Sequence, residues 1–159
     1  MRIGCTGHQT LSPSTRRNVA AAIAKILTEH ADDTLVGLSS LAQGADQLFA
    51  FAILAAGGEL HAVIPSERYE QSFTTDQARM TYTALLALAG EVTILSNAEP
   101  NEDAYLAAGH HVADQCELLI AVWDGQGAAS KGGTGDVVDY ARNRATNVEV
   151  VWPEGATRT

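Results

Sequence analysis

Short apolar runs alternate with longer segments of helical periodicity along the whole chain. The short runs predict β-strands at Met1–Thr6, Leu35–Ser39, Leu60–Ile64, Val92–Leu95, Leu118–Trp123 and Val148–Trp152. The intervening segments predict helices at Pro13–His30, Gly44–Ala56, Asp76–Ala89, Glu102–Cys116 and Thr134–Ala145. Strands that are apolar throughout and separated by helices are typical of a parallel sheet covered on both faces. We therefore expect a three-layer α/β fold with an open, mostly parallel sheet.

The predicted helix Gly44–Ala56 is apolar on every side from Leu48 onward. A helix of this kind is usually buried all round. It is either a central helix flanked by its neighbours or a helix whose outer face packs against a second subunit. We favour the second arrangement, which predicts a homodimer or a larger homo-oligomer.

The chain has 159 residues, of which 46% are hydrophobic and 18% charged. This size and composition predict a single domain over residues 1–159, with a frayed tail at 155–159. The formal net charge of −9 argues against a broad basic surface, so we expect nucleic acid to be an unlikely partner. With no signal peptide at the N-terminus and no long apolar run, we expect a cytoplasmic protein without a membrane partner.

Cysteines and histidines give no metal-binding pattern. Cys5 and Cys116 are far apart in the chain and lie in or beside apolar segments, which favours small buried side chains. The adjacent His110 and His111 point about 100° apart on a helix, so they do not converge on one ion. We predict no metal site.

Candidate ligand-binding residues follow the predicted strands, because open α/β sheets bind ligands at the carboxyl ends of their strands. They are Thr6, Gly7 and His8 after the first strand, Ser39 and Ser40 after the second, and Arg68 after the third. Gly132–Gly135 opens the last helix, where glycine amides and the helix dipole can bind a phosphate. The spacing matches neither a P-loop nor a dinucleotide-binding fingerprint.

Three blocks of the sequence together resemble the SLOG superfamily. They are Thr6-Gly7-His8, the Gly37-x-Ser39-x-x-Ala42-x-Gly44-Ala45-Asp46 segment, and the late Gly-Gly-Thr-Gly helix start. The superfamily includes DprA-type DNA-processing proteins, cytokinin-activating LOG phosphoribohydrolases, molybdenum-cofactor carrier-like proteins, and the YspA and YpsA-like families. The resemblance implies a Rossmann-like fold that binds nucleotides or nucleotide-derived ligands, often as a homo-oligomer.

The resemblance also assigns roles to residues. Gly132, Gly133 and Gly135 would form a phosphate-facing turn with the Thr134 hydroxyl, and Ser39, Ser40 and Gly44 would line the other side. Asp46 would either accept hydrogen bonds from ligand hydroxyls or only complement the dipole of its own helix.

The resemblance leaves three functions open. We favour binding of a nucleotide or nucleotide-derived ligand without a further cofactor. The first alternative is a LOG-like hydrolase that cleaves the N-glycosidic bond of a nucleoside monophosphate, with Asp139 or Asp136 as the catalytic carboxylate. In the LOG pattern, a threonine and a glutamate stand where this chain has Asp136 and the shorter Asp139. The second alternative is a carrier of a pterin-type cofactor.

Overall fold

The computed structural model describes residues 1–127 and 133–159, and these residues form one open, fully parallel sheet. The strand order is β4–β3–β2–β1–β5–β6. The strands are β1 (Arg2–Gly7), β2 (Val36–Ser39), β3 (Glu59–Ser66), β4 (Glu91–Asn97), β5 (Leu118–Val122) and β6 (Asn147–Val151). The predicted strands and the α/β class are confirmed.

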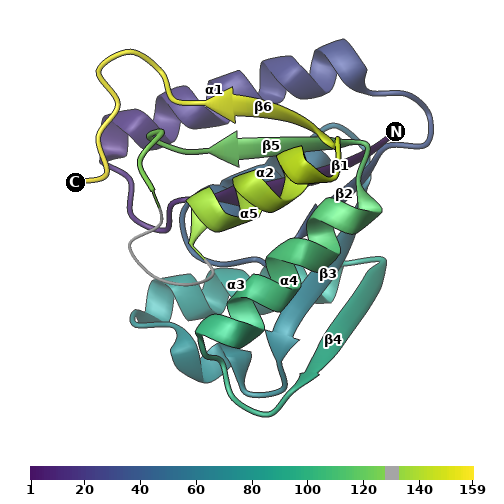
Figure 1. The fold of residues 1–159 in the computed structure, drawn as a ribbon, viewed down its shortest axis with the longest axis vertical. Coiled ribbons are helices and arrows are strands. Elements are labelled where there is room, and N and C mark those ends of the chain that lie inside the picture. Colours follow the sequence, from purple (N-terminus) through teal and green to yellow (C-terminus); the bar gives the residue numbers. More distant parts are fainter. Residues whose placement is uncertain (128–132) are drawn as a thin grey trace.

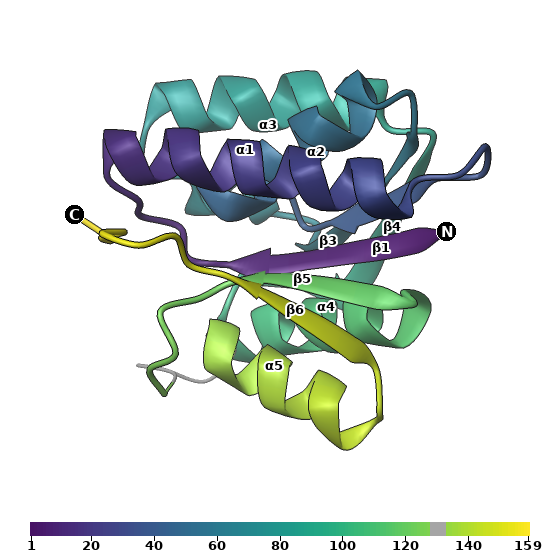
Figure 2. The same ribbon diagram turned by 90° about the horizontal axis from the view of Figure 1, so that it is seen from above.

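Helices cover both faces of the sheet. On one face lie α1 (Pro13–His30), α2 (Ala45–Ala55) and α3 (Asp76–Leu88), and on the other lie α4 (Glu102–Gln115) and α5 (Thr134–Asn143), as Figures 1 and 2 show. The chain moves outward from β1 to β4 and then returns to place β5 on the other side of β1. The neighbouring strands β1 and β5 therefore lead into helices on opposite faces. This reversal is where open α/β sheets form their ligand crevice.

The helix starts fall into two groups. The side chains of Ser12, Thr75 and Asn101 cap α1, α3 and α4 by accepting a backbone N–H of the first turn. By contrast, α2 and α5 begin after Gly44 and Gly133, and no side chain of the described residues caps either one. The first amides of a helix have no partner within the helix. At the start of α5, those of Thr134 and Gly135 can therefore bond a group outside the helix.

Helix α2 lies between α1 and α3, with Phe49 and Ile53 completely buried. Phe51 is its large exposed apolar side chain, at 52% exposure. The burial of α2 is thus explained by its neighbours within the chain, and the subunit contact expected at this helix stays a prediction. The pattern alone could not tell a neighbouring helix from a neighbouring subunit, because both bury the same side chains.

Two segments outside the five long helices and the sheet make contacts with distant residues. The polar stretch after β3 contains the short helix η1 (Tyr69–Ser72), and Tyr69 and Phe73 are buried against Tyr82. In the segment expected to fray, the Thr157 backbone N–H donates to Thr15 Oγ1 at 2.9 Å. Among the described helices, none is long and apolar enough to cross a membrane.

Candidate functional site

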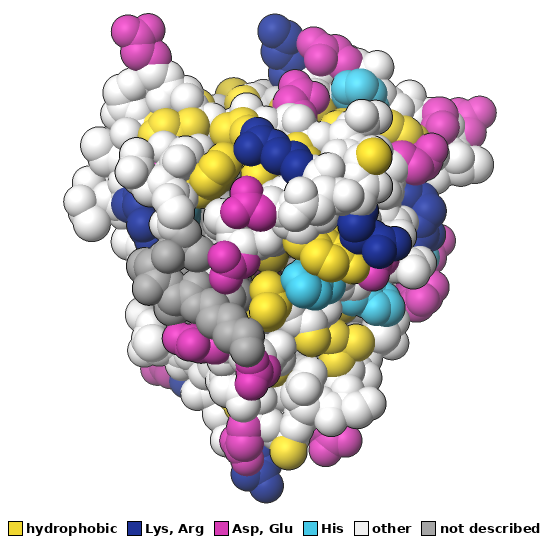
Figure 3. Space-filling model, viewed as in Figure 1, with side chains coloured by type: hydrophobic (Ala, Val, Ile, Leu, Met, Phe, Trp, Pro, Cys, Tyr) yellow, Lys and Arg dark blue, Asp and Glu magenta, His cyan; other side chains and the backbone are white. Residues whose placement is uncertain are grey.

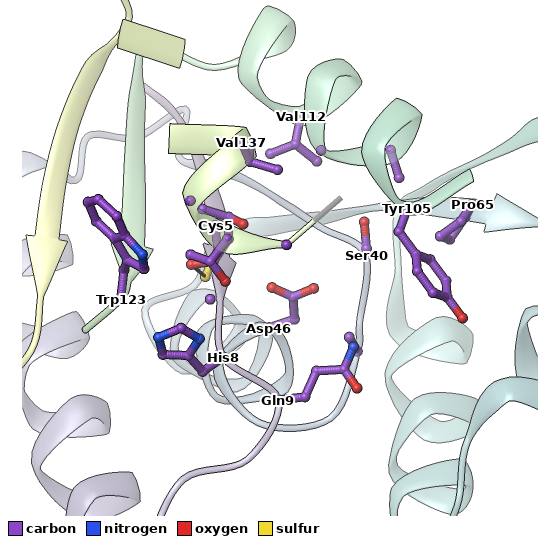
Figure 4. A pocket seen from close by; sticks show the side chains of 18 of the residues that line it. Cys5, His8, Gln9, Ser40, Asp46, Pro65, Tyr105, Val112, Trp123 and Val137 are labelled. Carbon is purple, nitrogen blue, oxygen red and sulfur yellow. Dashed lines mark hydrogen bonds between the residues drawn. The ribbon is translucent and has the colours of Figure 1, made fainter. Parts of the chain in front are cut away.

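A cavity of about 370 Å³ opens at the carboxyl ends of the central strands (Figure 4). Its floor comes from β1 and the loops that follow β1 and β2, and its walls come from α4, the start of α5 and the loop after β5. The side chains are polar near the floor and aromatic at the sides. The polar and aromatic lining residues are Thr6, His8, Gln9, Thr10, Ser40, Asp46, Tyr69, Tyr105, Trp123, Gln126, Thr134 and Arg158.

Asp46 is the most perturbed acidic group of the cavity. It lies in the first turn of α2, and its carboxyl group points from the floor into the cavity (Figure 4). Oδ1 is shielded from solvent and has no hydrogen-bond partner among the described residues. Burial raises the pKa of Asp46 from 3.8 to about 7, although interactions with the Ala42 backbone and the Cys5 side chain oppose the rise. A carboxyl group in this state is suited to exchanging a hydrogen bond with a ligand.

Cys5 lies beside Asp46 in the cavity floor. Burial and the neighbouring Asp46 raise the pKa of the Cys5 thiol well above its usual value. The thiol therefore remains protonated at neutral pH and is not an activated nucleophile. Both cysteines are free thiols.

The start of α5 lines the opposite side of the cavity through Gly133, Thr134 and Gly135. Gly133 has an extended backbone (φ −69°, ψ 171°), and the Asp136 N–H already bonds the Gly133 carbonyl. The amides of the first turn, with the positive end of the helix dipole, face the cavity without a side-chain cap among the described residues. This arrangement can bind an anion. Gly132, predicted to share this role, lies outside the described residues.

His8 joins the loops that follow β1 and β5. Its Nε2 accepts the Asp124 backbone N–H at 3.0 Å, and its ring packs edge-on against Trp152. Burial lowers the pKa of His8, and the positive charge of Arg158 adds to this effect, while Asp124 opposes it. A neutral ring that accepts through Nε2 carries its proton on Nδ1. His8 therefore lines the cavity and also holds two of its loops together.

Three predicted ligand residues lie outside this cavity. Ser39 is buried, where its hydroxyl donates to the Asp46 carbonyl and accepts the Leu41 N–H. Leu41 has a positive φ of 58°, so these hydrogen bonds of Ser39 stabilise a strained loop. Gly44 is a close-packed turn position against the backbone of Gln9. Arg68 is exposed and pairs with Glu99 at 2.7 Å.

The two candidate catalytic carboxylates are not among the described residues that line the cavity. Asp139 is exposed on α5, and Asp136 is partly buried in the first turn of the same helix. Asp139 lies three residues beyond Asp136, on the same side of α5 but about one turn further from the helix start that lines the cavity. The predicted residues that the structure brings together are Thr6, Gly7, His8, Ser40, Asp46, Gly133, Thr134 and Gly135.

Several cavity residues had no signal in the sequence. Trp123 and Gln126 come from the loop after β5, and the Trp123 indole donates to the Gln126 carbonyl at 2.7 Å. Tyr105 comes from α4, and Arg158 from the C-terminal segment. Only the proximity of Trp123 to the end of a strand could have pointed to it. In the described part of the chain, no cluster of three or more His, Cys, Asp or Glu is placed to hold a metal ion.

Comparisons with known proteins identify solved structures that have a similar fold. No protein-family model matches the chain, and no curated protein matches its sequence. Among solved structures, DNA processing protein A (DprA) from Streptococcus pneumoniae is similar, with a TM-score of 0.67 and 19% identity over 97% of this chain. DprA from Helicobacter pylori has a TM-score of 0.70 and 13% identity over 99% of this chain. The Chlamydomonas rheinhardtii Moco carrier protein has a TM-score of 0.55 and 14% identity over 94%.

The fold is the Rossmann-like α/β fold of these solved structures. This confirms the Rossmann-like architecture that the resemblance to the SLOG superfamily implied. The chain spans 51% of the Streptococcus pneumoniae DprA, 68% of the Helicobacter pylori DprA and 74% of the Moco carrier protein. At these identities, the similarity establishes the fold and not an activity.

The expectation that nucleic acid is an unlikely partner is corrected by these relatives. The Helicobacter pylori DprA structure is described in terms of a single-stranded DNA binding mode. A net charge of −9 is a property of the whole chain, whereas an anion site needs only a helix start and a nearby cation. On the face that carries α4 and α5, acidic and basic side chains are interspersed (Figure 3). Net charge is therefore no ground for excluding nucleic acid as a partner.

Proposed function

We propose that this protein binds a nucleotide or a nucleotide-derived ligand in the cavity at the carboxyl ends of β1, β2 and β5. The observation that carries the proposal is a cavity with two opposed poles. One pole is the start of α5, which no side chain of the described residues caps and whose dipole attracts an anion, and the other is the buried carboxyl group of Asp46. A nucleotide offers a group for each, since its phosphate is an anion and its sugar and base carry hydrogen-bond donors.

The size and walls of the cavity support a ligand of this class. A volume of about 370 Å³ lies within the usual range of small-ligand sites, about 300–1,000 Å³. Trp123 and Tyr105 lie on opposite sides of the cavity (Figure 4). Aromatic side chains in a nucleotide site contribute stacking and apolar contact with a base. The phosphate would lie on the Thr134 and Gly135 amides, with the sugar or base toward Ser40 and Asp46.

A single strand of nucleic acid is the second candidate, favoured by the similarity to DprA structures. The same cavity would then hold one nucleotide of the strand. A pterin-type carrier function has support in the fold of the Moco carrier protein. The LOG-like hydrolase keeps the least support, because Asp139 is exposed and neither Asp139 nor Asp136 lines the described cavity.

Nucleoside monophosphates are expected to raise the melting temperature of the protein. At about 100 times its dissociation constant, a ligand stabilises the native state by about 2.7 kcal/mol, which is roughly 5–10 °C for a chain of this size. The measurement is a thermal-shift series with the four common monophosphates, the nucleosides alone, a pterin and a short single-stranded oligodeoxynucleotide. If none of the nucleotides shifts the transition, the proposal is wrong.

Asp46→Asn is expected to weaken binding by roughly 10–100-fold, since hydrogen bonds to charged groups contribute about 1.5–3 kcal/mol. Asp33→Asn is the matched control because Asp33 is exposed in a turn before β2, at the opposite end of that strand from the cavity residue Ser40. Calorimetric titration of both variants distinguishes them, and equal affinities would contradict the role of Asp46. Release of free base from a monophosphate would instead establish the hydrolase.

A further inference from the structure

We infer that the C-terminal segment is part of the ligand site, and that the Arg158 guanidinium binds the anionic group of the ligand. The inference rests on the proposed function and names a residue that no sequence motif indicated. It is based on two observations. Hydrogen bonds hold the segment at the start of α1, and the described residues that line the cavity include one Lys or Arg.

Thr157 anchors the segment to the start of α1. Its N–H donates to Thr15 Oγ1 at 2.9 Å, and its carbonyl accepts the Ser12 N–H at 3.1 Å. Thr15 is 1% exposed, and its hydroxyl also accepts the Ser12 hydroxyl at 2.8 Å. The anchor is therefore the rigid, capped end of a helix. Figures 1 and 2 show that the C-terminal segment lies beyond the carboxyl ends of β5 and β6, near the start of α1.

The anchor brings Arg158 to the cavity as its sole Lys or Arg among the lining residues that the structure describes. The guanidinium lies 3.8 Å from Asp124 Oδ2, and the side chain of Arg158 is 50% exposed. An ion pair at that distance and exposure is weak. The other oxygen of Asp124 accepts the Gln126 N–H at 3.0 Å, and this bond is the main reason that the pKa of Asp124 is lowered. Arg158 thus has a distant partner whose carboxylate is already bonded elsewhere.

A phosphate is a better partner for Arg158 than Asp124 is. Arginine presents parallel N–H donors that match two phosphate oxygens, and such charge-assisted pairs are short and strong. Positive charge from the described lining residues is limited, because the start of α5 supplies only a partial charge, and Asp46 is partly ionised at neutral pH since its pKa is about 7. Arg158 would add a full positive charge while Thr157 holds its backbone in place.

The test compares a charged ligand with its uncharged counterpart. In Arg158→Gln, the affinity for the tightest-binding nucleoside monophosphate should fall about tenfold, while the affinity for the same nucleoside stays unchanged. The loss should shrink at high salt, because a half-exposed charge is screened. Arg17→Gln is the matched control, since Arg17 is exposed on α1 and does not line the cavity.

A second variant tests the anchor. Thr15→Val keeps the shape of the side chain but removes the hydroxyl that accepts the Thr157 N–H, so it should give the same charge-selective loss as Arg158→Gln. If monophosphate binds and Arg158→Gln affects nucleotide and nucleoside equally, or neither, the inference is overturned and the proposed function stands. If the wild-type protein binds no nucleotide at all, both are overturned.

Discussion

An Asp46→Asn protein is expected to be more stable than the wild type at about pH 8 and to lose that advantage as the pH falls toward about 4. The reason is the burial of Asp46, whose pKa is raised from 3.8 to about 7 in the folded protein. Ionised Asp46 is shielded from water, with no partner for Oδ1 among the described residues. The neutral amide of asparagine avoids this penalty.

The direction of this pH dependence follows from the pKa of Asp46, which is 3.8 in the unfolded chain and about 7 in the folded protein. Between about pH 4 and pH 7 the folded state keeps a proton on Asp46 that the unfolded state has lost, so the stability of the wild type falls as the pH rises. Since one pKa unit corresponds to about 1.4 kcal/mol, the rise from 3.8 to about 7 amounts to roughly 4 kcal/mol. This loss is complete above about pH 7, where both states are ionised, and Asp46→Asn should recover it.

Urea denaturation from about pH 4 to pH 8 measures the effect as the difference between variant and wild type. Taking the difference cancels the titration of every other group. Asp33→Asn, an exposed aspartate in a turn, should follow the wild type throughout. Parallel curves for Asp46→Asn and the wild type would show that the Asp46 carboxyl is not destabilised. A gain in stability with a loss of ligand affinity would identify a group kept for binding at the expense of stability.

Gly44→Ala is expected to destabilise the protein by about 3 kcal/mol or more. Gly44 has φ 84° and ψ −127°, a conformation that is essentially restricted to glycine and costs other residues about 1–3 kcal/mol. An added Cβ would also lie 2.4 Å from the Gln9 carbonyl oxygen and 2.6 Å from that of His8. These are backbone atoms, so the loop after β1 would have to move, and the cavity floor with it.

Gly57→Ala provides a matched control for Gly44→Ala. Gly57 also has a positive φ, 78°, but an added Cβ there has no heavy atom within 4 Å. Its cost should be limited to the backbone preference, about 1–2 kcal/mol. Thermal and urea unfolding of the two variants separate backbone strain from close packing. Equal destabilisation would mean that the loop after β1 tolerates a side chain at position 44.

The location of the site could be predicted from the sequence, but only part of its composition could. Small and polar residues after the strands correctly marked Thr6, Ser40 and Asp46 as cavity residues. Ser39 and Ser40 look alike in the sequence, yet Ser39 is bonded into the loop and Ser40 faces the cavity. Neighbouring residues in an extended segment point in opposite directions, so the choice between them depends on the exact end of β2.

The order of apolar and amphipathic segments by itself determined the parallel sheet, the helices on both faces and the helix start at Thr134. These features depend on local periodicity and on residues that begin or end helices. Only the tertiary structure decided that α2 is covered by α1 and α3, that Asp46 is buried deeply enough to raise its pKa to about 7, and that Arg158 reaches the cavity. The physical reason is that burial, desolvation and charge pairing depend on neighbours far away in the chain. Arg158 lines a cavity with Thr6 because the hydroxyl of Thr15 holds Thr157, and no local pattern encodes that contact.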